Sequence, residues 1–129
     1  MKKKILIVED NKDSREIMSL FLTKMGYDPI KAKNSNEAIA LAETEEPDLI
    51  FMDMELPDLD GVKTTTIIRK NPKTSHIPVV ALTAWISELW QEKAAQVGIV
   101  TYLIKPVAPQ TLKQTIEEYT RGSVPAARI

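Results

Sequence analysis

The chain has 129 residues, a length typical of one domain, and its 17 basic and 18 acidic residues leave a net charge of −1. A balanced charge argues against nucleic-acid binding, which usually shows as a basic excess. Cysteine is absent and His76 is the single histidine, so disulfides, thiolate metal sites and multi-histidine metal sites are excluded.

The N-terminal sequence MKKKILIVED has only the beginning of a targeting signal. Its apolar run, Ile5 to Val8, is too short for a signal peptide and ends in two acids. No other stretch approaches the ~20 apolar residues of a membrane span. We therefore expect a cytoplasmic protein that does not contact membranes.

Five short apolar runs have the character of β-strands. Continuous apolar runs are typical of strands that are covered on both faces, as in parallel sheets. One of the five runs, 28–32, is less apolar than the others and suits an edge strand. The four clear runs are 4–8, 48–52, 77–82 and 100–104, and the weaker one is 28–32.

Segments with helical spacing of apolar residues lie between these runs. They are 14–25, 35–45 with a cap at Asn34 or Ser35, 87–97 with a cap at Ser87, and 109–120 opened by Pro109. In the first of them, Ile17, Leu20, Phe21 and Met25 fall near one face, which we expect to be buried.

Segment 60–70, DGVKTTTIIRK, is ambiguous because runs of threonine and isoleucine favour strands. Parallel neighbours need a crossover between them, so the alternation elsewhere favours a helix here. The result is five β-α units in a doubly wound α/β domain.

Polar residues stand where four of the predicted strands end. They are Glu9 and Asp10, then Asp53, then Thr83 and Ala84, and finally Lys105. Ligands of open parallel sheets bind outside the carboxyl ends of the strands, so these residues would share one rim.

Clustered carboxylates need a cation, because two unit charges about 4 Å apart repel by roughly 4 kcal/mol at an effective dielectric near 20. Mg²⁺ takes oxygen ligands together with phosphate and water. Acids, a lysine and a hydroxyl at one rim therefore indicate a phosphoryl-transfer site. Acids at exposed strand ends are also common without a function, and Asp58 and Asp60 suit a turn and a helix cap.

Four motifs carry a family resemblance: ILIVEDN (5–11), LIFMDMELPDLDG (49–61), IPVVALTA (77–84) and YLIKP (102–106). Together they resemble the receiver domain of bacterial two-component response regulators, over about residues 3–120. The resemblance implies a flavodoxin-like fold of five parallel strands in the order 2-1-3-4-5. We expect a receiver domain over 1–122, a flexible tail over 123–129, and a stand-alone receiver similar to the chemotaxis-type regulator.

The resemblance also implies roles for the acids. Asp53 is expected to accept the phosphoryl group. Glu9, Asp10, Asp53 and the backbone carbonyl of Glu55 are expected to hold Mg²⁺ or Mn²⁺.

A second set of residues resembles the switch of the family. Thr83, followed by Ala84, would bond the phosphoryl group through its hydroxyl, and Lys105 would pair with that group. Tyr102 would turn inward when Thr83 moves. The bond between Lys105 and Pro106 is expected to be cis.

The expected partners follow from the same resemblance. A sensor histidine kinase or a histidine phosphotransfer protein would donate the phosphoryl group. A downstream protein would bind the face formed by 87–97, 100–104 and 109–120. The chain would be a substrate and switch rather than an enzyme.

Two positions near the site depart from the usual pattern of the family. Glu55 and Trp85 lie two residues beyond Asp53 and Thr83, and both flank the path of an attacking water. Our hypothesis is that Trp85 shields the acyl phosphate from hydrolysis. The alternative is that Trp85 only packs on its loop or on a partner.

A second departure is the apolar character of Ile99 and Val100. With Trp85, Leu89 and Trp90, these residues would leave an apolar patch suited to a partner or a homodimer. The alternative is that Trp90 and Ile99 fill the core.

Two other functions compete with a phospho-acceptor switch. An aspartate-nucleophile phosphatase also uses Mg²⁺ and an acyl phosphate, but DMELP supplies Glu55 without the threonine or valine that follows in that class. A degenerate receiver would bind partners without phosphate. The full set of acids, threonine and lysine argues against that function.

Overall fold

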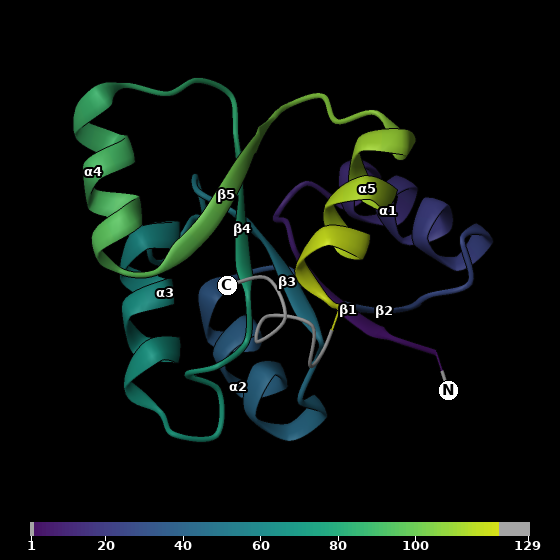
Figure 1. Cartoon of the computed structure of the whole chain (residues 1–129), viewed down its shortest axis with the longest axis horizontal. Coiled ribbons are helices and arrows are strands. Elements are labelled where there is room, and N and C mark those ends of the chain that lie inside the picture. The colour runs from purple at the N-terminus through teal and green to yellow at the C-terminus, as the bar shows by residue number, and fades with distance from the viewer. Residues whose placement is uncertain (1, 122–129) are drawn as a thin grey trace.

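The computed structural model describes residues 2–121, in which five strands alternate with five helices. All strand pairs are parallel, in the order β2-β1-β3-β4-β5 (Figure 1), so the predicted flavodoxin-like α/β fold is confirmed. The expected tail over 123–129 lies outside the described residues. The elements are β1 (Lys4–Val8), α1 (Lys12–Lys24), β2 (Asp28–Ala32), α2 (Ser35–Glu45), β3 (Leu49–Asp53), α3 (Gly61–Lys70), β4 (Val79–Thr83), α4 (Glu88–Gln96), β5 (Ile99–Ile104) and α5 (Pro109–Tyr119).

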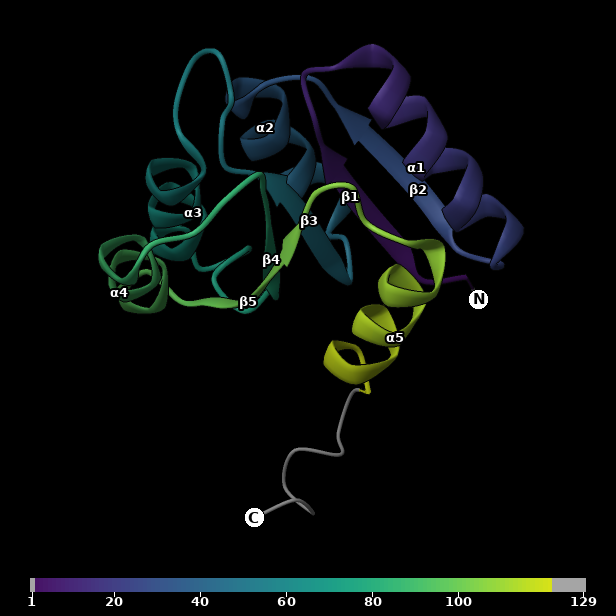
Figure 2. The ribbon, with the colours of Figure 1, turned by 90° about the horizontal axis from the view of Figure 1, so that it is seen from above.

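The helices form a layer on each face of the sheet, α1 and α5 on one face and α2, α3 and α4 on the other (Figure 2). Alternate strand residues point to opposite faces. In β1, Ile5 and Ile7 pack toward α1 and α5, whereas Leu6 and Val8 pack toward α2. This explains why the sequence of the central strands is continuously apolar.

Helix α1 corrects one expectation. Ile17 and Leu20 are 51% and 53% exposed, although the sequence pattern placed them on the buried face. The helix packs instead through Met18, Phe21 and Met25 around the fully buried Leu22. That set has the i, i+3, i+4, i+7 spacing of one helix face, which lies one residue beyond the predicted stripe.

The threonine-rich segment forms helix α3, as predicted from the crossover argument. The hydroxyls of Thr64, Thr65 and Thr66 each donate to the carbonyl four residues earlier, at 2.7–2.9 Å. Asp60 caps the helix by accepting the amide of Lys63 at 2.8 Å. The threonines therefore satisfy their hydroxyls within the helix and do not oppose it.

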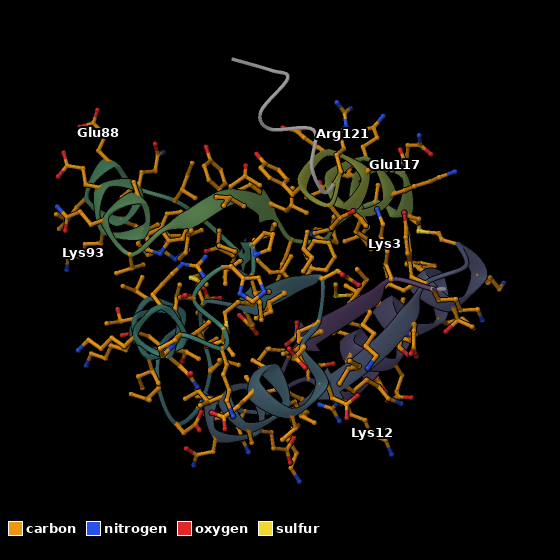
Figure 3. The ribbon with its side chains drawn as sticks, turned by 60° about the horizontal axis from the view of Figure 1, so that its bottom comes forward. Lys3, Lys12, Glu88, Lys93, Glu117 and Arg121 are labelled. Atoms are coloured by element: carbon orange, nitrogen blue, oxygen red, sulfur yellow. The ribbon has the colours of Figure 1, made fainter. Side chains whose placement is uncertain are left out.

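Charged side chains lie on the outer surfaces of the helices (Figure 3). Lys3, just before β1, reaches the end of α5, where its Nζ donates to the carbonyl and the hydroxyl of Thr120 at 2.8 and 2.7 Å. This contact joins the two ends of the domain. In the described part of the chain, no helix has the length and apolar character needed to cross a bilayer.

Candidate phosphoryl-transfer site

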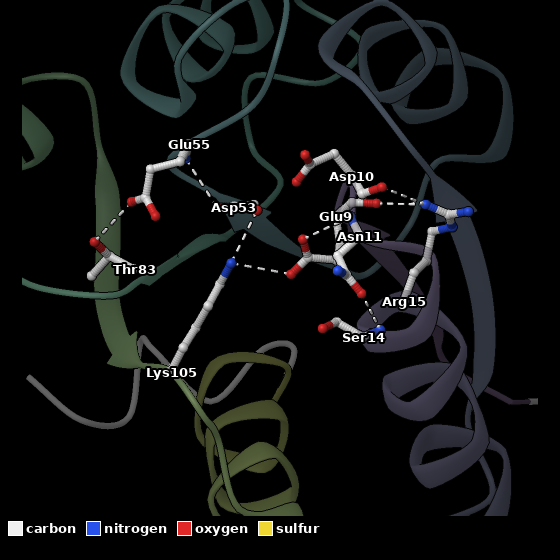
Figure 4. A network of polar contacts seen from close by, with 9 residues as sticks. All are labelled: Glu9, Asp10, Asn11, Ser14, Arg15, Asp53, Glu55, Thr83 and Lys105. Atoms are coloured by element: carbon white, nitrogen blue, oxygen red, sulfur yellow. Dashed lines mark hydrogen bonds and ion pairs between the residues drawn. The ribbon is translucent and has the colours of Figure 1, made fainter.

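Three carboxylates meet at the carboxyl ends of the two central strands (Figure 4). Asp53 is the last residue of β3, and Glu9 follows β1, which pairs with β3 up to Val8 and Met52. Each of Glu9, Asp10 and Asp53 offers an oxygen within 4.8 Å of the others. Glu9 and Asp53 are 3% and 1% exposed, whereas Asp10 faces solvent.

Lys105 is the cation of this cluster. Its Nζ lies 3.1 Å from Glu9 Oε1 and 3.0 Å from Asp53 Oδ2. The backbone amide of Lys105 donates to the carbonyl of Thr83 at 2.9 Å, and the peptide bond from Lys105 to Pro106 is cis, as predicted. Burial acts to lower the pKa of Lys105, but Asp53 and Glu9 outweigh it and raise that pKa. The ammonium group therefore stays charged.

The electrostatics of the cluster favour an added cation. Burial, with contributions from the neighbouring Asp53, raises the pKa of Glu9 from 4.5 to about 7. One lysine does not balance three carboxylates at this spacing. All the donors are oxygens, which is the set that Mg²⁺ and Mn²⁺ prefer, so the residues present fit such an ion.

Both oxygens of Asp53 are held in place. The backbone amide of Glu55 donates to Oδ1 at 2.9 Å, while Lys105 contacts Oδ2. The carboxylate therefore has a defined orientation at the rim. The predicted role of the Glu55 carbonyl as a metal ligand stays a prediction.

Two residues that the sequence analysis missed orient the acidic pair. Arg15 donates from Nη1 to the carbonyl of Glu9 at 2.8 Å and to that of Asp10 at 3.4 Å. Asn11 donates its amide to Glu9 Oε2 at 3.2 Å and caps α1 by accepting the amide of Ser14. An arginine one turn into a helix that follows an acidic pair was the available signal for Arg15.

Thr83 reaches the same rim, but its hydroxyl is engaged away from Asp53. It is the last residue of β4 and is 3% exposed. The hydroxyl donates to the carbonyl of Trp85 at 2.7 Å, and Oε2 of Glu55 lies at 3.3 Å. Since a hydroxyl has one proton, the shorter contact is its main hydrogen bond. Ala84, the next residue, is exposed.

Comparison with known proteins identifies the arrangement. The sequence matches the response regulator receiver domain family over residues 5–117. The chain belongs to this family. Receiver domains are the signalling switches of two-component systems, and they bind Mg²⁺ in an acidic pocket.

Individual relatives agree with the family assignment. The polar-differentiation response regulator DivK of Brucella anthropi is 34% identical over 119 residues, which are 92% of this chain and 97% of that protein. The chemotaxis protein CheY4 of Vibrio cholerae has a TM-score of 0.88 and 28% identity over 92% of this chain and 99% of its own.

One of the solved structures with a similar fold contains a metal ion. It is the receiver domain of the sensor histidine kinase PA1611 from Pseudomonas aeruginosa, with a magnesium ion coordinated in the active-site cleft. Its TM-score is 0.85, and it is 31% identical over 93% of this chain and 98% of its own.

Several aromatic and aliphatic side chains of α4, of β5 and of the segment before α4 are exposed. Trp85 and Leu89 are 68% and 62% exposed, and Val100 is 41% exposed. Ile99 is buried in the core, and Trp90 packs partly against the core. The core-filling alternative therefore holds for Ile99 and in part for Trp90, and an apolar patch formed by the exposed residues stays a prediction.

Tyr102 lies in β5, half-buried, with its ring against Trp90. The ring centroids are 5.7 Å apart and the planes meet at 85°, an edge-to-face contact. Trp90, Trp85 and Thr83 line a cavity of about 450 Å³ together with Glu55. Tyr102 lies outside this cavity, so the predicted switch aromatic faces Trp90 and not Thr83.

The two acids that the sequence analysis placed in a turn and a cap do have structural roles. Asp60 caps α3, and Asp58 accepts the backbone amides of Ser35 and Asn36 at 3.0 and 3.2 Å. These bonds, the one from Ser35 foremost, lower the pKa of Asp58 to about 2. Asp58 therefore ties the loop after β3 to the N-terminus of α2, a long-range contact that the sequence pattern did not show.

Proposed function

We propose that this receiver domain accepts a phosphoryl group on Asp53 and changes the α4-β5-α5 face in response. The observation that carries the proposal is the Asp53 carboxylate itself. It is buried at the end of the central strand, held by Lys105 and the Glu55 amide, and surrounded by Glu9 and Asp10. A structural aspartate has no need of two further acids at this distance.

The transfer step uses the Asp53 carboxylate as the nucleophile. A carboxylate oxygen attacks the phosphorus of a phosphohistidine, and the P–N bond breaks as its electron pair returns to the imidazole. The other ring nitrogen of the phosphohistidine carries a proton, so the products are an acyl phosphate on Asp53 and a neutral histidine on the donor, which is a sensor histidine kinase or a histidine phosphotransfer protein. Lys105, at 3.0 Å from Asp53, is placed to pair with the transferred group.

Glu9, Asp10, Asp53 and the backbone carbonyl of Glu55 would hold Mg²⁺ or Mn²⁺. Such an ion, when bound, offsets negative charge on the phosphoryl oxygens. Glu9 contributes while it is ionised, and Arg15 and Asn11 keep its backbone and carboxylate in place.

The switch would follow from the added charge. A phosphoryl group adds about −1.5 to −2 charge and strong acceptor oxygens. Thr83 would exchange the Trp85 carbonyl for a phosphoryl oxygen, and Tyr102 would move toward the space behind Thr83. Ala84 is the next residue in the chain, so it would move together with Thr83.

The downstream partner would bind the apolar residues exposed on the α4-β5-α5 face. These include Leu89, Val100 and Ile104, the last 45% exposed.

A homodimer through the same face is the alternative to a downstream partner. Sedimentation at high concentration, with and without a phosphoryl mimic, tests it: a monomer in both states excludes the dimer.

Intact-mass spectrometry after incubation with acetyl phosphate and Mg²⁺ tests the central proposal. We expect one added phosphate in the wild type and none in Asp53→Asn or in the presence of a chelator. Asp48→Asn is the matched control, because it makes the same change of charge just before the opposite end of β3. There the Asp48 carboxylate accepts the backbone amide of Lys4. An unmodified wild type, or a modified Asp53→Asn, would contradict the proposal.

Trp85 is proposed to slow the hydrolysis of the acyl phosphate. It lines the cavity that also contains Thr83 and Glu55, and the backbone amide of Glu55 donates to Asp53. Trp85→Ala should shorten the lifetime of the phosphorylated protein, measured by intact mass after the phosphodonor is removed. Leu89→Ala removes an exposed side chain from the same face and should leave the lifetime unchanged. Equal lifetimes for all three proteins would remove Trp85 from the proposal.

A further inference from the structure

Trp90 lies between two hollows on the α4 side of the domain. The larger hollow, about 450 Å³, has Thr83 on its wall, and the smaller, about 220 Å³, has Tyr102 on its wall. Among the residues that the structure describes, Trp90 is the one that lines both. The indole therefore forms the partition between the space behind Thr83 and the surface that Tyr102 occupies.

The larger hollow has room for an aromatic side chain. Its volume is within the range of roughly 300–1,000 Å³ found for pockets that hold drug-sized ligands. Tyr102 meets Trp90 edge-on at 5.7 Å and 85°. The way from Tyr102 into this hollow is therefore blocked by the indole rather than by a lack of space.

A short series of contacts connects Thr83 with Trp90. The Thr83 hydroxyl donates to the carbonyl of Trp85 at 2.7 Å, which holds the segment leading to α4. Ser87 then caps α4 by accepting the amide of Trp90 at 3.2 Å. When Thr83 gives up the Trp85 carbonyl, the segment that positions the first turn of α4 loses a tether.

Helix α4 is lightly anchored compared with its neighbour α3. Ala94 is its one buried residue, whereas α3 buries Gly61, Thr64, Thr65 and Ile68. Segments with few buried contacts move at low cost in free energy. A shift of the first turn of α4, carrying Trp90, is therefore the least costly rearrangement beside Thr83.

We propose that Trp90 is the positioning residue that couples Thr83 to Tyr102: its indole closes the hollow behind Thr83 until the release of Trp85 lets the first turn of α4 shift. Tyr102 then enters the hollow. The inference rests on the proposed function, in which Thr83 moves to a phosphoryl group on Asp53. It adds a gate between the two switch residues.

Fluorine NMR on the full chain labelled with 3-fluorotyrosine tests the gate. The chain has three tyrosines, and Tyr102→Phe assigns the Tyr102 signal. In the wild type this signal should shift when acetyl phosphate and Mg²⁺ are added. In Trp90→Ala the gate is absent, so the signal of the unphosphorylated protein should already lie near the phosphorylated position, with most of the shift lost.

Two control variants separate a gate from a general loss of structure. Trp90→Phe keeps an aromatic ring against Tyr102 and should restore the shift. Leu89→Ala removes a neighbouring side chain that lines neither hollow, and should keep the shift of the wild type. A full phosphorylation-dependent shift in Trp90→Ala, or loss of the shift in Leu89→Ala, would overturn the inference.

Intact mass measured on the same samples distinguishes the two levels of proposal. Phosphate on the wild type and on Trp90→Ala, with equal Tyr102 shifts in both, refutes the gate and leaves Asp53 as the acceptor. Phosphate on the wild type with no movement of Tyr102 refutes the gate as well. A wild type that takes up no phosphate refutes the proposed function, and the gate with it.

Discussion

The two halves of the site are built in different ways. The acid half, made of Glu9, Asp10, Asp53 and Lys105, has two carboxylates almost fully buried and joined through one ammonium at 3.0 and 3.1 Å. The switch half, made of Thr83, Trp85, Trp90 and Tyr102, has a hydroxyl turned to a backbone carbonyl, an indole that is 68% exposed, and a cavity of about 450 Å³.

The difference follows from the positions of the strands. β3 lies in the middle of the sheet and is buried along its whole length, whereas β5 is an edge strand and only Ile99 in it is buried. Helix α4, which covers this edge, has one buried residue. Asp53 thus stands on a strand that is buried throughout, whereas Trp90 and Tyr102 of the switch half lie on α4 and β5, which have one buried residue each and can move at lower cost.

The prediction with the largest expected effect compares the loss of unfolding free energy caused by one substitution in each half. Phe51→Ala, in the strand that carries Asp53, should lower the free energy of unfolding by about 3–5 kcal/mol, because it leaves a cavity in a fully buried position. Leu89→Ala, on α4 and 62% exposed, should change it by no more than about 0.5 kcal/mol. Urea unfolding measures both, and similar costs would show that the two halves are equally well anchored.

The second prediction concerns the charge of the acid half. The folded protein raises the pKa of Glu9 from 4.5 to about 7, so folding is favoured by protonation and stability should fall as the pH rises through this window. In a chelator at pH 8, Glu9→Gln should therefore be more stable than the wild type, by up to about 3 kcal/mol.

Urea unfolding from pH 4 to pH 8 measures this effect. The advantage of Glu9→Gln should disappear below about pH 4.5, where Glu9 is protonated in both states. Glu92→Gln, at an exposed position on α4, is the matched control and should follow the wild type. A variant that is less stable than the wild type at pH 8 would show that the Lys105 ion pair outweighs the burial of charge.

A smaller effect is expected at the cap of α4. Ser87→Ala removes the acceptor of the Trp90 amide and should cost about 1 kcal/mol of stability. Asn34→Ala, at the corresponding cap of α2, should cost a similar amount. Because α4 is lightly anchored, hydrogen exchange should also rise throughout α4 in Ser87→Ala, but stay local in Asn34→Ala. The same pattern of hydrogen exchange in both variants would contradict the proposal that α4 is more lightly anchored than α2.

The smallest effect is expected at Asp58, an exposed carboxylate that ties the loop after β3 to α2. Its pKa is lowered from 3.8 to about 2, so its stabilising effect is present above pH 3.8 and is lost as the pH falls through about 2. Asp58→Asn should be slightly less stable than the wild type at pH 7, and the two unfolding curves should converge as the pH falls below 4. A difference that persists at low pH would mean that the charge is not what matters.

The sequence predicted the fold and most of the rim because both depend on local patterns. Continuous apolar runs indicated central parallel strands, and the residues that follow such strands meet at one edge for any protein of this topology. Glu9, Asp10, Asp53 and Lys105 came together for that reason. The cap at Asp60 and the helix over the threonine run were equally within reach of local rules.

Other features depend on contacts between elements distant in sequence. Ile17 and Leu20 matched a helical stripe, but only the packing of α1 beside α5 decided that Met18 and Leu22 would be the inner residues. Asp58 accepts hydrogen bonds from backbone amides that lie 22 and 23 residues earlier in the chain, and no local sequence motif predicts such a contact.

The sequence by itself thus determined the topology, the acidic cluster and its lysine, because strand order and strand ends set where those groups lie. Only the tertiary structure decided the state of the switch. The hydroxyl of Thr83 could turn to Asp53 or to its own loop, and in the folded chain it donates to the carbonyl of Trp85, while Tyr102 packs edge-on against Trp90. These choices depend on small differences between alternative packings, which a pattern of residue types does not record.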